Sequence, residues 1–341
     1  MPTALVTGAT GLVGSHIVER LQSEAQSHSS EWTVRALVRS PSSWLESRGV
    51  ECVQGDVMDR ASFVRAARRV DAIFHTAAAI TQHGGWETYR SLNVDGTANA
   101  IAAAESSGAR LLQLSSVAVY GPTGRYRAAG EKTDETTPLG PLPERAYYAR
   151  SKRESEELVL GAHAAGRIWA TAVRPDVIYG PRDRQFVPRI GRLLSRGVAP
   201  LIAGGTSTLA IVHAANVADG AVRAVLHDDA GGQTYNLAND YDVTVREFFA
   251  LAMEGLGRRV RFVRIPESVA RGAFAVVRGF FKLATGGRMS VVSNASVAML
   301  TENNPFTSER ARRELGWIPL VHPREGIPEA FRWWKQCATH R

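Results

Sequence analysis

The sequence has few cysteines, no long apolar run and no block of like charge, and each absence excludes a class of protein. Its 341 residues include two cysteines, Cys52 and Cys337, which are too few for a disulfide framework and form no metal-spaced cluster. No run of about eighteen apolar residues predicts a membrane-spanning helix. Lysine and arginine number 41 against 33 acids, a net charge of +8, but they are scattered rather than gathered into a nucleic-acid-binding tract. We therefore expect no metal, no nucleic-acid partner and no stable membrane insertion.

The sequence does contain enough apolar material for a large core, since 44% of its residues are hydrophobic. That fraction and the chain length suit one elaborate domain or two lobes. The chain starts directly with an apolar strand, so we expect no signal peptide and a cytoplasmic location. The positive net charge favours a ligand that bears phosphate.

Apolar strand candidates alternate with helical stretches through the first half of the chain, which is typical of a parallel sheet with helices on both faces. Past Pro175 the alternation weakens. The sequence therefore predicts an α/β fold, with a Rossmann-type, doubly wound parallel sheet and a smaller α/β substrate lobe interleaved with it. The sheet is expected to take residues 1–181 and 210–239, and the lobe residues 182–209 and 240–341.

A glycine-rich turn follows the first strand candidate, residues 4–6, and precedes a stretch with helical periodicity. Strand, glycine turn and helix form the context that a dinucleotide-binding fingerprint requires. Glycines allow a tight turn and close backbone approach, and the helix N-terminus faces the pyrophosphate. The alternative is a glycine-rich turn without a ligand. The residues predicted to contact the cofactor here are Gly8, Thr10, Gly11, Leu12, Val13 and Gly14.

Tyr148 and Lys152 lie four residues apart, so on a helix their side chains share one face. An ammonium beside a phenol favours the phenolate, and we expect the pKa of Tyr148 to fall toward the working pH. Such a phenol suits a general acid/base that moves a proton to or from a carbonyl oxygen. An isolated pair of this kind is usually a solvated helix face, but the glycine turn favours the chemical interpretation.

Several short motifs occur in one order along the chain, and together they resemble those of the extended short-chain dehydrogenases/reductases, the NAD-dependent epimerase/dehydratase superfamily. The resemblance covers nearly the whole chain and is closest to the 3β-hydroxysteroid dehydrogenase and dihydroflavonol reductase branch. The motifs are residues 8–14, 55–57, 74–78, 93–97, 114–116, 119–121, Tyr148 with Lys152, Arg174-Pro175 and Val212-His213.

The resemblance implies a role for each matching position. Tyr148 is similar to the family's proton donor and acceptor, and Lys152 to the lysine that binds the nicotinamide ribose. Ser116, four residues before Tyr120, resembles the hydroxyl that polarises the carbonyl, where a donor stabilises developing charge. Asn93 matches a family asparagine, for which a catalytic role and a structural hydrogen bond both stay open.

Further positions resemble the family's cofactor contacts. Asp56 and Val57 look like the pair that holds the adenine ring, and small residues after the strand at 72–75 let the cofactor pass close above the sheet. His75 is interpreted as structural, and His213 either contacts the substrate or, as the preferred interpretation, is a buried histidine with satisfied hydrogen bonds. The remaining expected cofactor contacts are Thr76, Ala77, Ala78, Pro175 and Ile178, besides Tyr148 and Lys152.

The end of the second strand candidate, residues 33–38, bears on the choice between NAD and NADP. An acidic residue there would accept hydrogen bonds from the ribose hydroxyls and repel a 2′-phosphate. The sequence has Arg39 instead, which can pair with that phosphate. We therefore expect NADP in preference to NAD, with an exposed surface arginine as the alternative.

Two features of the second half bear on the substrate. Leu209 stands four residues before His213, where nucleotide-sugar members of the family often carry an arginine for the diphosphate. Residues 268–283 are largely apolar, with Arg271, Arg278 and Lys282 on one helical stripe. That segment is expected to line an apolar pocket, to rest on a membrane surface or to pack as an ordinary helix.

The sequence thus predicts an NADP(H)-dependent oxidoreductase that interconverts a ketone and a secondary alcohol on a bulky, largely apolar small molecule by hydride transfer. One alternative is a nucleotide-sugar epimerase or dehydratase with tightly bound NAD. A second is a dinucleotide-sensing regulator without turnover, although such relatives usually lack the Tyr148 and Lys152 pair. The resemblance also allows a homodimer, because members of the family often pair helices.

Overall fold

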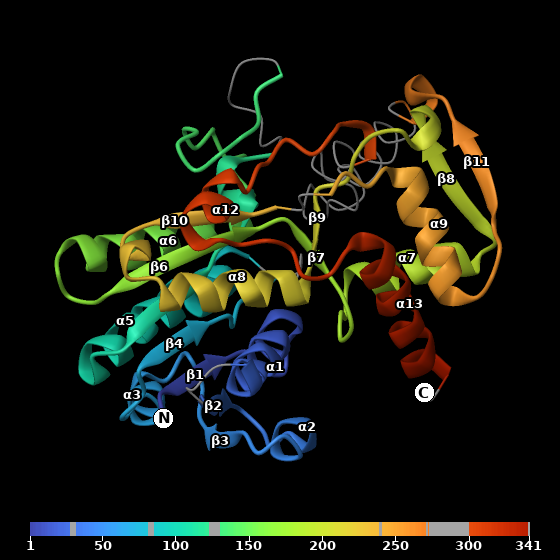
Figure 1. Cartoon of the computed structure of the whole chain (residues 1–341). Coiled ribbons are helices and arrows are strands. Elements are labelled where there is room, and N and C mark those ends of the chain that lie inside the picture. Colours follow the sequence, from blue (N-terminus) through green and yellow to red (C-terminus); the bar gives the residue numbers. More distant parts are fainter. Residues whose placement is uncertain are drawn as a thin grey trace.

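The computed structural model describes residues 1–27, 32–80, 85–122, 130–238, 241–270, 272 and 300–339. Its central feature is a seven-stranded parallel sheet in the order β10-β6-β5-β4-β1-β2-β3 (Figure 1). This order confirms the predicted doubly wound sheet, with the change of winding direction between β1 and β4. The strands are β1 (Thr3–Thr7), β2 (Thr33–Val38), β3 (Glu51–Gln54), β4 (Ala72–His75), β5 (Arg110–Leu114), β6 (Ala170–Pro175) and β10 (Thr234–Leu237).

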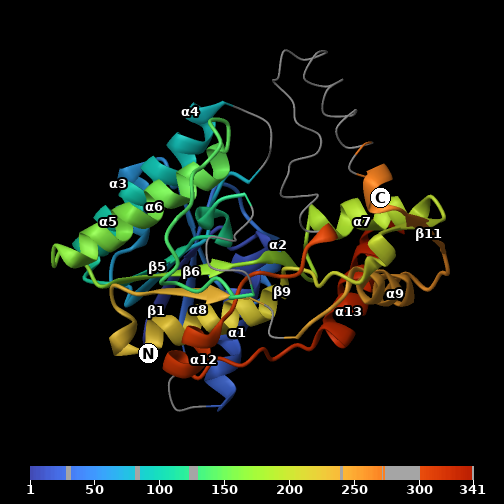
Figure 2. The same ribbon diagram turned by 90° about the horizontal axis from the view of Figure 1, so that it is seen from above.

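Helices cover both faces of this sheet (Figure 2). One face carries α1 (Leu12–Ser27), α8 (Ala214–Leu226) and α12 (Glu309–Leu315). The other face carries α3 (Arg60–Ala66), α5 (Gly96–Ser107) and α6 (Tyr147–Ala164). Because the sheet is covered on both sides, its central strands are buried on both faces and mostly apolar, instead of alternating between apolar and polar residues.

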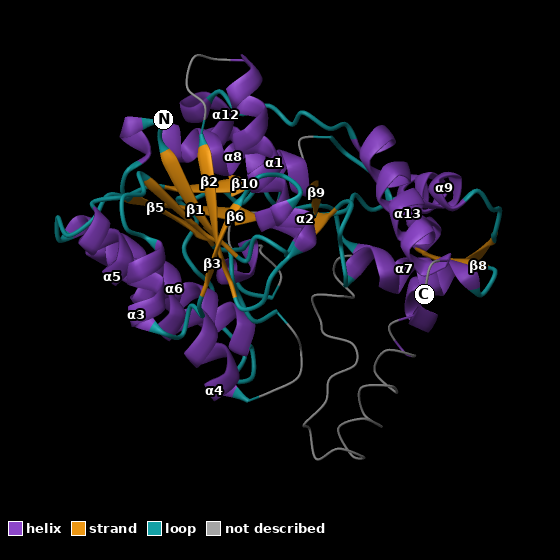
Figure 3. Cartoon of the chain, turned by 90° about the horizontal axis from the view of Figure 1, so that it is seen from below, coloured by secondary structure: helices purple, strands orange, loops and turns teal. Residues whose placement is uncertain are grey.

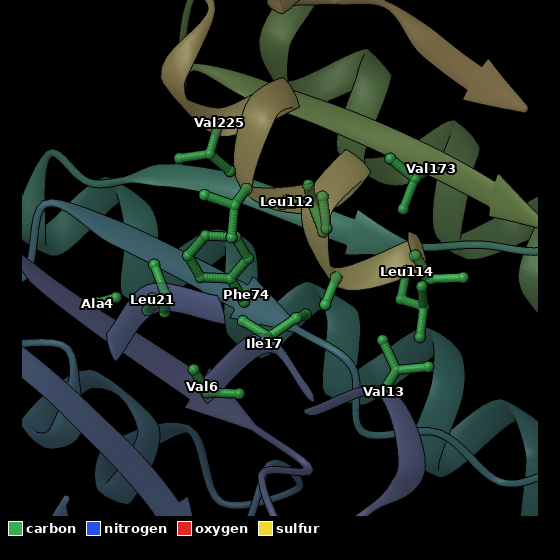
Figure 4. Packing of buried hydrophobic residues seen from close by; sticks show 14 of the residues in the cluster. Ala4, Val6, Val13, Ile17, Leu21, Phe74, Leu112, Leu114, Val173 and Val225 are labelled. Carbon is green, nitrogen blue, oxygen red and sulfur yellow. The ribbon is translucent and has the colours of Figure 1, made fainter. Parts of the chain in front are cut away.

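The core between the sheet and α1 shows how these strands are fixed. In Figure 4, Phe74 of β4 lies near Leu112 of β5 and Ile17 of α1, and all three side chains are fully buried. Burying one such side chain contributes about 1.5–3 kcal/mol to stability. The packing therefore sets the strand order and the position of the strand ends.

A second group of elements packs around its own apolar core, to one side of the sheet (Figures 1 and 3). The parallel strands β8 (Val198–Ile202) and β11 (Arg261–Ile265) pack with helices α7 (Phe186–Ser195), α9 (Val245–Leu256) and α13 (Pro323–Thr339). Strands β7 (Val177–Tyr179) and β9 (Ile211–His213) pair where the chain passes between the two groups. The exact boundaries of the two predicted units stay a prediction.

Shorter elements complete the described chain, and most of the segment 268–283 lies outside the described residues. None of the described helices is both long and apolar enough to cross a membrane. The short helices are α2 (Ser43–Glu46), α4 (Trp86–Tyr89), a π-helix (Arg90–Asp95) and 3₁₀ turns at Val117–Tyr120, Ala203–Gly205 and Asp228–Ala230.

A buried ion pair joins α6 to β6. Arg174 donates through Nε to Glu156 Oε2 at 3.0 Å, and both side chains are at most 7% exposed. Arg174 Nη1 also donates to the hydroxyl oxygen of Tyr120 at 2.8 Å. Burial alone would lower the pKa of Arg174, but the hydrogen bonds and charge of Glu156 raise it above its usual value. The guanidinium is therefore charged, and its stability in the core depends on this carboxylate.

Removing one partner of this pair should destabilise the fold strongly. We expect Glu156→Ala to lower the free energy of unfolding by about 3–5 kcal/mol, because Arg174 would be a buried charge without its counter-ion. Glu154→Ala is the matched control on the same helix, since Glu154 pairs with Arg150 at the surface and should contribute less than about 0.5 kcal/mol. Urea denaturation measures both, and similar losses for the two variants would contradict the account.

Candidate active site

A cleft of about 1100 Å³ opens at the carboxyl ends of the central strands, beside the switch between β1 and β4. Open α/β sheets bind ligands at this position. The cleft brings together every predicted site residue except Asn93. They are Gly8, Thr10, Gly11, Leu12, Val13, Gly14, Arg39, Asp56, Val57, Thr76, Ala77, Ala78, Ser116, Tyr148, Lys152, Pro175 and Ile178.

The glycine turn between β1 and α1 is packed so tightly that side chains would not fit at two of its positions. Gly8 has a left-handed backbone (φ 68°), and a Cβ there would lie 2.9 Å from the amide nitrogen of Ala77. A Cβ on Gly14 would lie 2.3 Å from the carbonyl oxygen of Gly8. Gly11 closes the turn, because its N–H donates to that same oxygen at 2.8 Å. The turn therefore presses the start of α1 against the ends of β1 and β4.

Hydrogen bonds that involve side chains hold the ends of β1 and β4 together next to this turn. Thr76 Oγ1 donates to the carbonyl oxygen of Thr7 at 2.7 Å, and Thr7 Oγ1 lies 2.9 Å from Nδ1 of His75. Burial, aided by the charge of Lys152, lowers the pKa of His75 to about 3. His75 is therefore neutral, and its contact with Thr7 is structural.

Ser116, Tyr148 and Lys152 meet where β5 ends against α6. The Ser116 side chain caps the following 3₁₀ turn, since its Oγ accepts from the amide of Ala118 at 3.2 Å. The Ser116 hydroxyl also acts on the phenol of Tyr148, because it lowers the pKa of that phenol. Lys152 is 3% exposed, and its Nζ donates to the carbonyl oxygen of Leu114 at 2.7 Å. Two hydroxyls and an ammonium are thus gathered at one wall of the cleft.

The pKa values at this wall differ from the expectation for Tyr148. Burial raises the pKa of Tyr148, and the hydrogen bond from Ser116 opposes the rise only in part. The predicted lowering by Lys152 is wrong for this structure, because the ammonium donates to the Leu114 carbonyl instead of to the phenol. Burial lowers the pKa of Lys152 itself from 10.5 to about 8, although the charge of Glu156 acts in the opposite direction.

Asn93 lies in the π-helix and is buried behind the cleft wall. Its Oδ1 accepts from the amide of Ala79 at 2.6 Å, and its Nδ2 donates to Ser151 Oγ at 2.9 Å. Its own carbonyl oxygen accepts from Ser155 Oγ at 2.7 Å. Of the two interpretations left open by the sequence, the structural one describes these contacts: Asn93 ties the segment after β4 to α6.

Leu209 does not line the cleft, so it forms no apolar wall there, and the argument that this position lacks a diphosphate-binding arginine stays a prediction. It is 3% exposed and packs into the core formed by α7, α9 and α13. Its extended neighbours Thr208 and Ala210 line the cleft instead. Alternate residues of an extended segment point in opposite directions, which is why the side chain at position 209 turns away from the ligand space.

A further part of the cleft wall was missed by the sequence analysis. It comes from the segment between β7 and α7 and from residues that precede α12, and these segments meet the sheet only through long-range contacts. A run of charged residues directly after Gly180-Pro181 was the available signal. The additional lining residues include Arg182, Asp183, Arg184, Gln185, Phe186, Thr208, Ala210, Glu302, Asn303, Asn304, Pro305 and Phe306.

The fold and this site define an α/β enzyme that binds a nicotinamide dinucleotide. The profile of the NAD dependent epimerase/dehydratase family matches residues 4–238, and the chain belongs to that family. It is an NAD(P)-dependent oxidoreductase.

Two curated relatives agree with the predicted branch. The 3beta-hydroxysteroid-dehydrogenase/decarboxylase isoform 1 of Arabidopsis thaliana is 29% identical over 345 residues, covering 95% of this chain and 77% of the relative. The 2-alkyl-3-oxoalkanoate reductase of Shewanella oneidensis is 29% identical over 342 residues, covering 95% and 84%.

Solved structures share the fold over the whole chain. The structure of gox2253 has a TM-score of 0.76 at 27% identity and covers 99% of both chains. MoeE5 in complex with UDP-glucuronic acid and NAD has a TM-score of 0.71 at 22% identity, covering 98% of this chain and 99% of MoeE5. The second likeness concerns the fold alone.

The lowered pKa of Lys152 makes stability depend on pH in a defined direction. Between pH 8 and 10.5 the unfolded chain holds a proton on Lys152 that the folded chain has lost, so the wild type should gain stability as pH rises. Between pH 7.5 and 9.5, the free energy of unfolding of the wild type should rise by about 2 kcal/mol relative to that of Lys152→Met. Denaturant unfolding at several pH values measures the difference, and a constant gap would show that Lys152 is not perturbed.

Proposed function

We propose that this protein is an NADP(H)-dependent oxidoreductase that interconverts a ketone and a secondary alcohol on a bulky, largely apolar substrate. The observation that carries the proposal is the placement of two hydroxyl side chains, Ser116 and Tyr148, on the cleft lining together with Lys152. Two hydroxyl donors converging on one point suit a carbonyl oxygen. The remaining observations concern the cofactor, the proton and the apolar part of the cleft.

The glycine turn fits a dinucleotide. Gly8 and Gly14 fold the backbone close against the ends of β1 and β4, and α1 begins directly after the turn with its N-terminus at the cleft. Amide groups at a helix N-terminus bind phosphate. The nicotinamide of a bound cofactor supplies or accepts the hydride, and Tyr148 would donate or accept the proton.

Tyr148 is the proposed proton donor and acceptor. With its pKa raised by burial, the phenol is protonated at neutral pH, which is the form that reduction of a carbonyl requires. Ser116 would hydrogen-bond to the same oxygen and stabilise the charge that develops there. Lys152 has a pKa of about 8, so its ammonium stays charged at neutral pH at the base of the site. Proton transfer by such a group contributes about 10²–10⁴ to the rate.

The apolar substrate is supported by the side chains around this wall. Ile80 and Leu92 lie on one side of the cleft lining, and Phe186 and Phe306 come from the segments opposite. Apolar surface removed from water stabilises a complex by about 25 cal/mol per Å². The curated relatives named as a hydroxysteroid dehydrogenase and an oxoalkanoate reductase also suit a carbonyl or alcohol on an apolar frame.

The preference for NADP is supported by Arg39. This residue follows β2, is exposed and lines the cleft beside Asp56. No salt bridge joins Arg39 to a carboxylate among the described residues, so its guanidinium can pair with a 2′-phosphate. We also propose that residues 1–181 with 210–239 form the dinucleotide unit, and residues 182–209 with 240–341 the substrate lobe.

A nucleotide-sugar epimerase or dehydratase is the second candidate, because the cleft lining is partly polar. Thr208, Asn303 and Asn304 place polar groups on the cleft lining. Such an enzyme uses its NAD catalytically and retains it. A mass spectrum of the cofactor released on denaturation separates the candidates, since retained NAD favours the epimerase.

Tyr148→Phe removes the transferable proton while leaving the ring in place. We expect kcat to fall by more than about a hundredfold, with the affinity for the cofactor nearly unchanged. Tyr147→Phe is the matched control, because the neighbouring Tyr147 packs against Trp86 and Tyr89 outside the cleft lining. Turnover is measured with the ketone that the wild type reduces fastest. Near-normal kcat in Tyr148→Phe would exclude the proposed role.

Arg39→Asp should change the cofactor preference. The substitution removes a phosphate partner and adds a like charge, so the affinity for NADPH should fall relative to NADH by about 1–3 kcal/mol. Arg258→Asp makes the same charge change at an exposed position in the second group of elements and should leave the preference unaltered. Fluorescence titration gives both affinities, and an equal effect on the two cofactors would disprove this role for Arg39.

A further inference from the structure

The segment between β7 and α7 is fixed to α1 by an arginine that the function described so far does not use. Arg182 Nε donates to Ser15 Oγ at 2.8 Å, and its Nη2 bonds to Glu19. Its guanidinium also stacks over the ring of Trp44, with 5.1 Å to the centroid. Arg182 has a left-handed backbone (φ 72°), so the chain turns sharply at this residue.

The next residue, Asp183, is held through its side chain. Asp183 is 4% exposed, and its carboxylate accepts from the backbone amides of Gln185 at 2.7 Å and Val187 at 2.9 Å. These bonds fix the start of α7. Arg184 therefore directly follows two anchored residues and precedes Gln185, whose amide is held by Asp183, so its backbone has little freedom to move away from the cleft.

Arg184 itself points at the glycine turn. Its side chain is exposed, lines the cleft, and donates through Nη2 to the carbonyl oxygen of Thr10 at 3.4 Å. That contact is long and uses one of the five donors of a guanidinium. No carboxylate forms a salt bridge with Arg184 within the described parts of the chain. Its positive charge and its other donors are therefore available beside the turn.

We propose that Arg184 binds the pyrophosphate of the dinucleotide beside the glycine turn. A planar guanidinium matches the paired oxygens of a phosphate, and a phosphate is a stronger acceptor than the Thr10 carbonyl that it contacts now. The backbone amides of residues 10–12 and the side chain of Arg184 would then hold the pyrophosphate between them.

The proposed contact affects the selectivity between NAD and NADP and the connection between the sheet and the second group of elements. The pyrophosphate is common to NAD and NADP, so Arg184 serves both equally, whereas Arg39 reads the 2′-phosphate. Because Arg184 belongs to the segment that leads into α7, a bound dinucleotide would also link the sheet to the second group of elements. The inference rests on the proposed function, since it needs dinucleotide binding.

The test is the affinity of the purified full-length protein for NADPH and NADH, measured by fluorescence titration without substrate. We expect Arg184→Ala to weaken both by the same factor, about tenfold or more, and Arg184→Lys to restore part of the loss. Arg189→Ala is the matched control, because Arg189 is exposed on α7 and does not line the cleft. Thermal unfolding without ligand confirms that each variant is folded.

Three results would overturn the inference while leaving the proposed function intact: unchanged affinity in Arg184→Ala, a loss confined to NADPH, or an equal loss in Arg189→Ala. The second would place Arg184 on the 2′-phosphate, and the third would reduce the effect to overall charge. A wild type that binds neither dinucleotide would overturn both the inference and the proposed function. Because the titration contains no substrate, a change in affinity reports on the dinucleotide alone.

Discussion

The close approach of backbone to backbone at the glycine turn is the constraint on which the rest of the structure depends. Gly14 sits against the carbonyl oxygen of Gly8, and Gly8 sits against the end of β4. This contact sets where α1 starts, and α1 in turn packs onto the sheet and α8. Because the turn fills little space, the carboxyl ends of the strands stay open, and the cleft lies there. A methyl group at either glycine would have to move β4, α1 or both.

The chemistry of the site is determined by the side chains that line this opening. Strand β5 ends at Leu114, so Ser116 stands at the rim, and α6 brings Tyr148 and Lys152 to the same wall. The side chains behind them are held by Asn93 and by the buried pair of Arg174 and Glu156. Burial is the dominant influence on the titrating groups. It keeps Tyr148 protonated and brings the pKa of Lys152 down to about 8.

Local patterns in the sequence predicted the parts of the structure that are set locally. The alternation of strands and helices predicted the doubly wound sheet, and three glycines at spacing three predicted the turn. Ser116, Tyr148 and Lys152 were chosen by motif and spacing, and the fold places all three on one cleft. These signals work because each depends on residues that are neighbours in the chain.

The features that were missed depend on longer-range contacts or on side-chain rotamers. Spacing put Lys152 beside Tyr148, but a long flexible side chain bonds the acceptor that tertiary packing supplies, here the Leu114 carbonyl. The sequence alone identified position 209 by its spacing from His213. The direction of a side chain on an extended segment, however, depends on which neighbours bury it. Arg184 contacts Thr10 of the glycine turn although the two residues lie more than 170 positions apart in the sequence. No local pattern encodes that contact.

The central claim is that this cleft reduces an apolar ketone at the expense of a nicotinamide cofactor. The most direct measurement incubates the protein with NADPH and a panel of apolar ketones, with common nucleotide sugars in parallel, and follows the absorbance of the reduced nicotinamide. The account predicts that at least one apolar ketone is converted to its alcohol with one NADPH consumed for each product. Conversion of a nucleotide sugar without net consumption of cofactor, while every ketone leaves NADPH untouched, would contradict it.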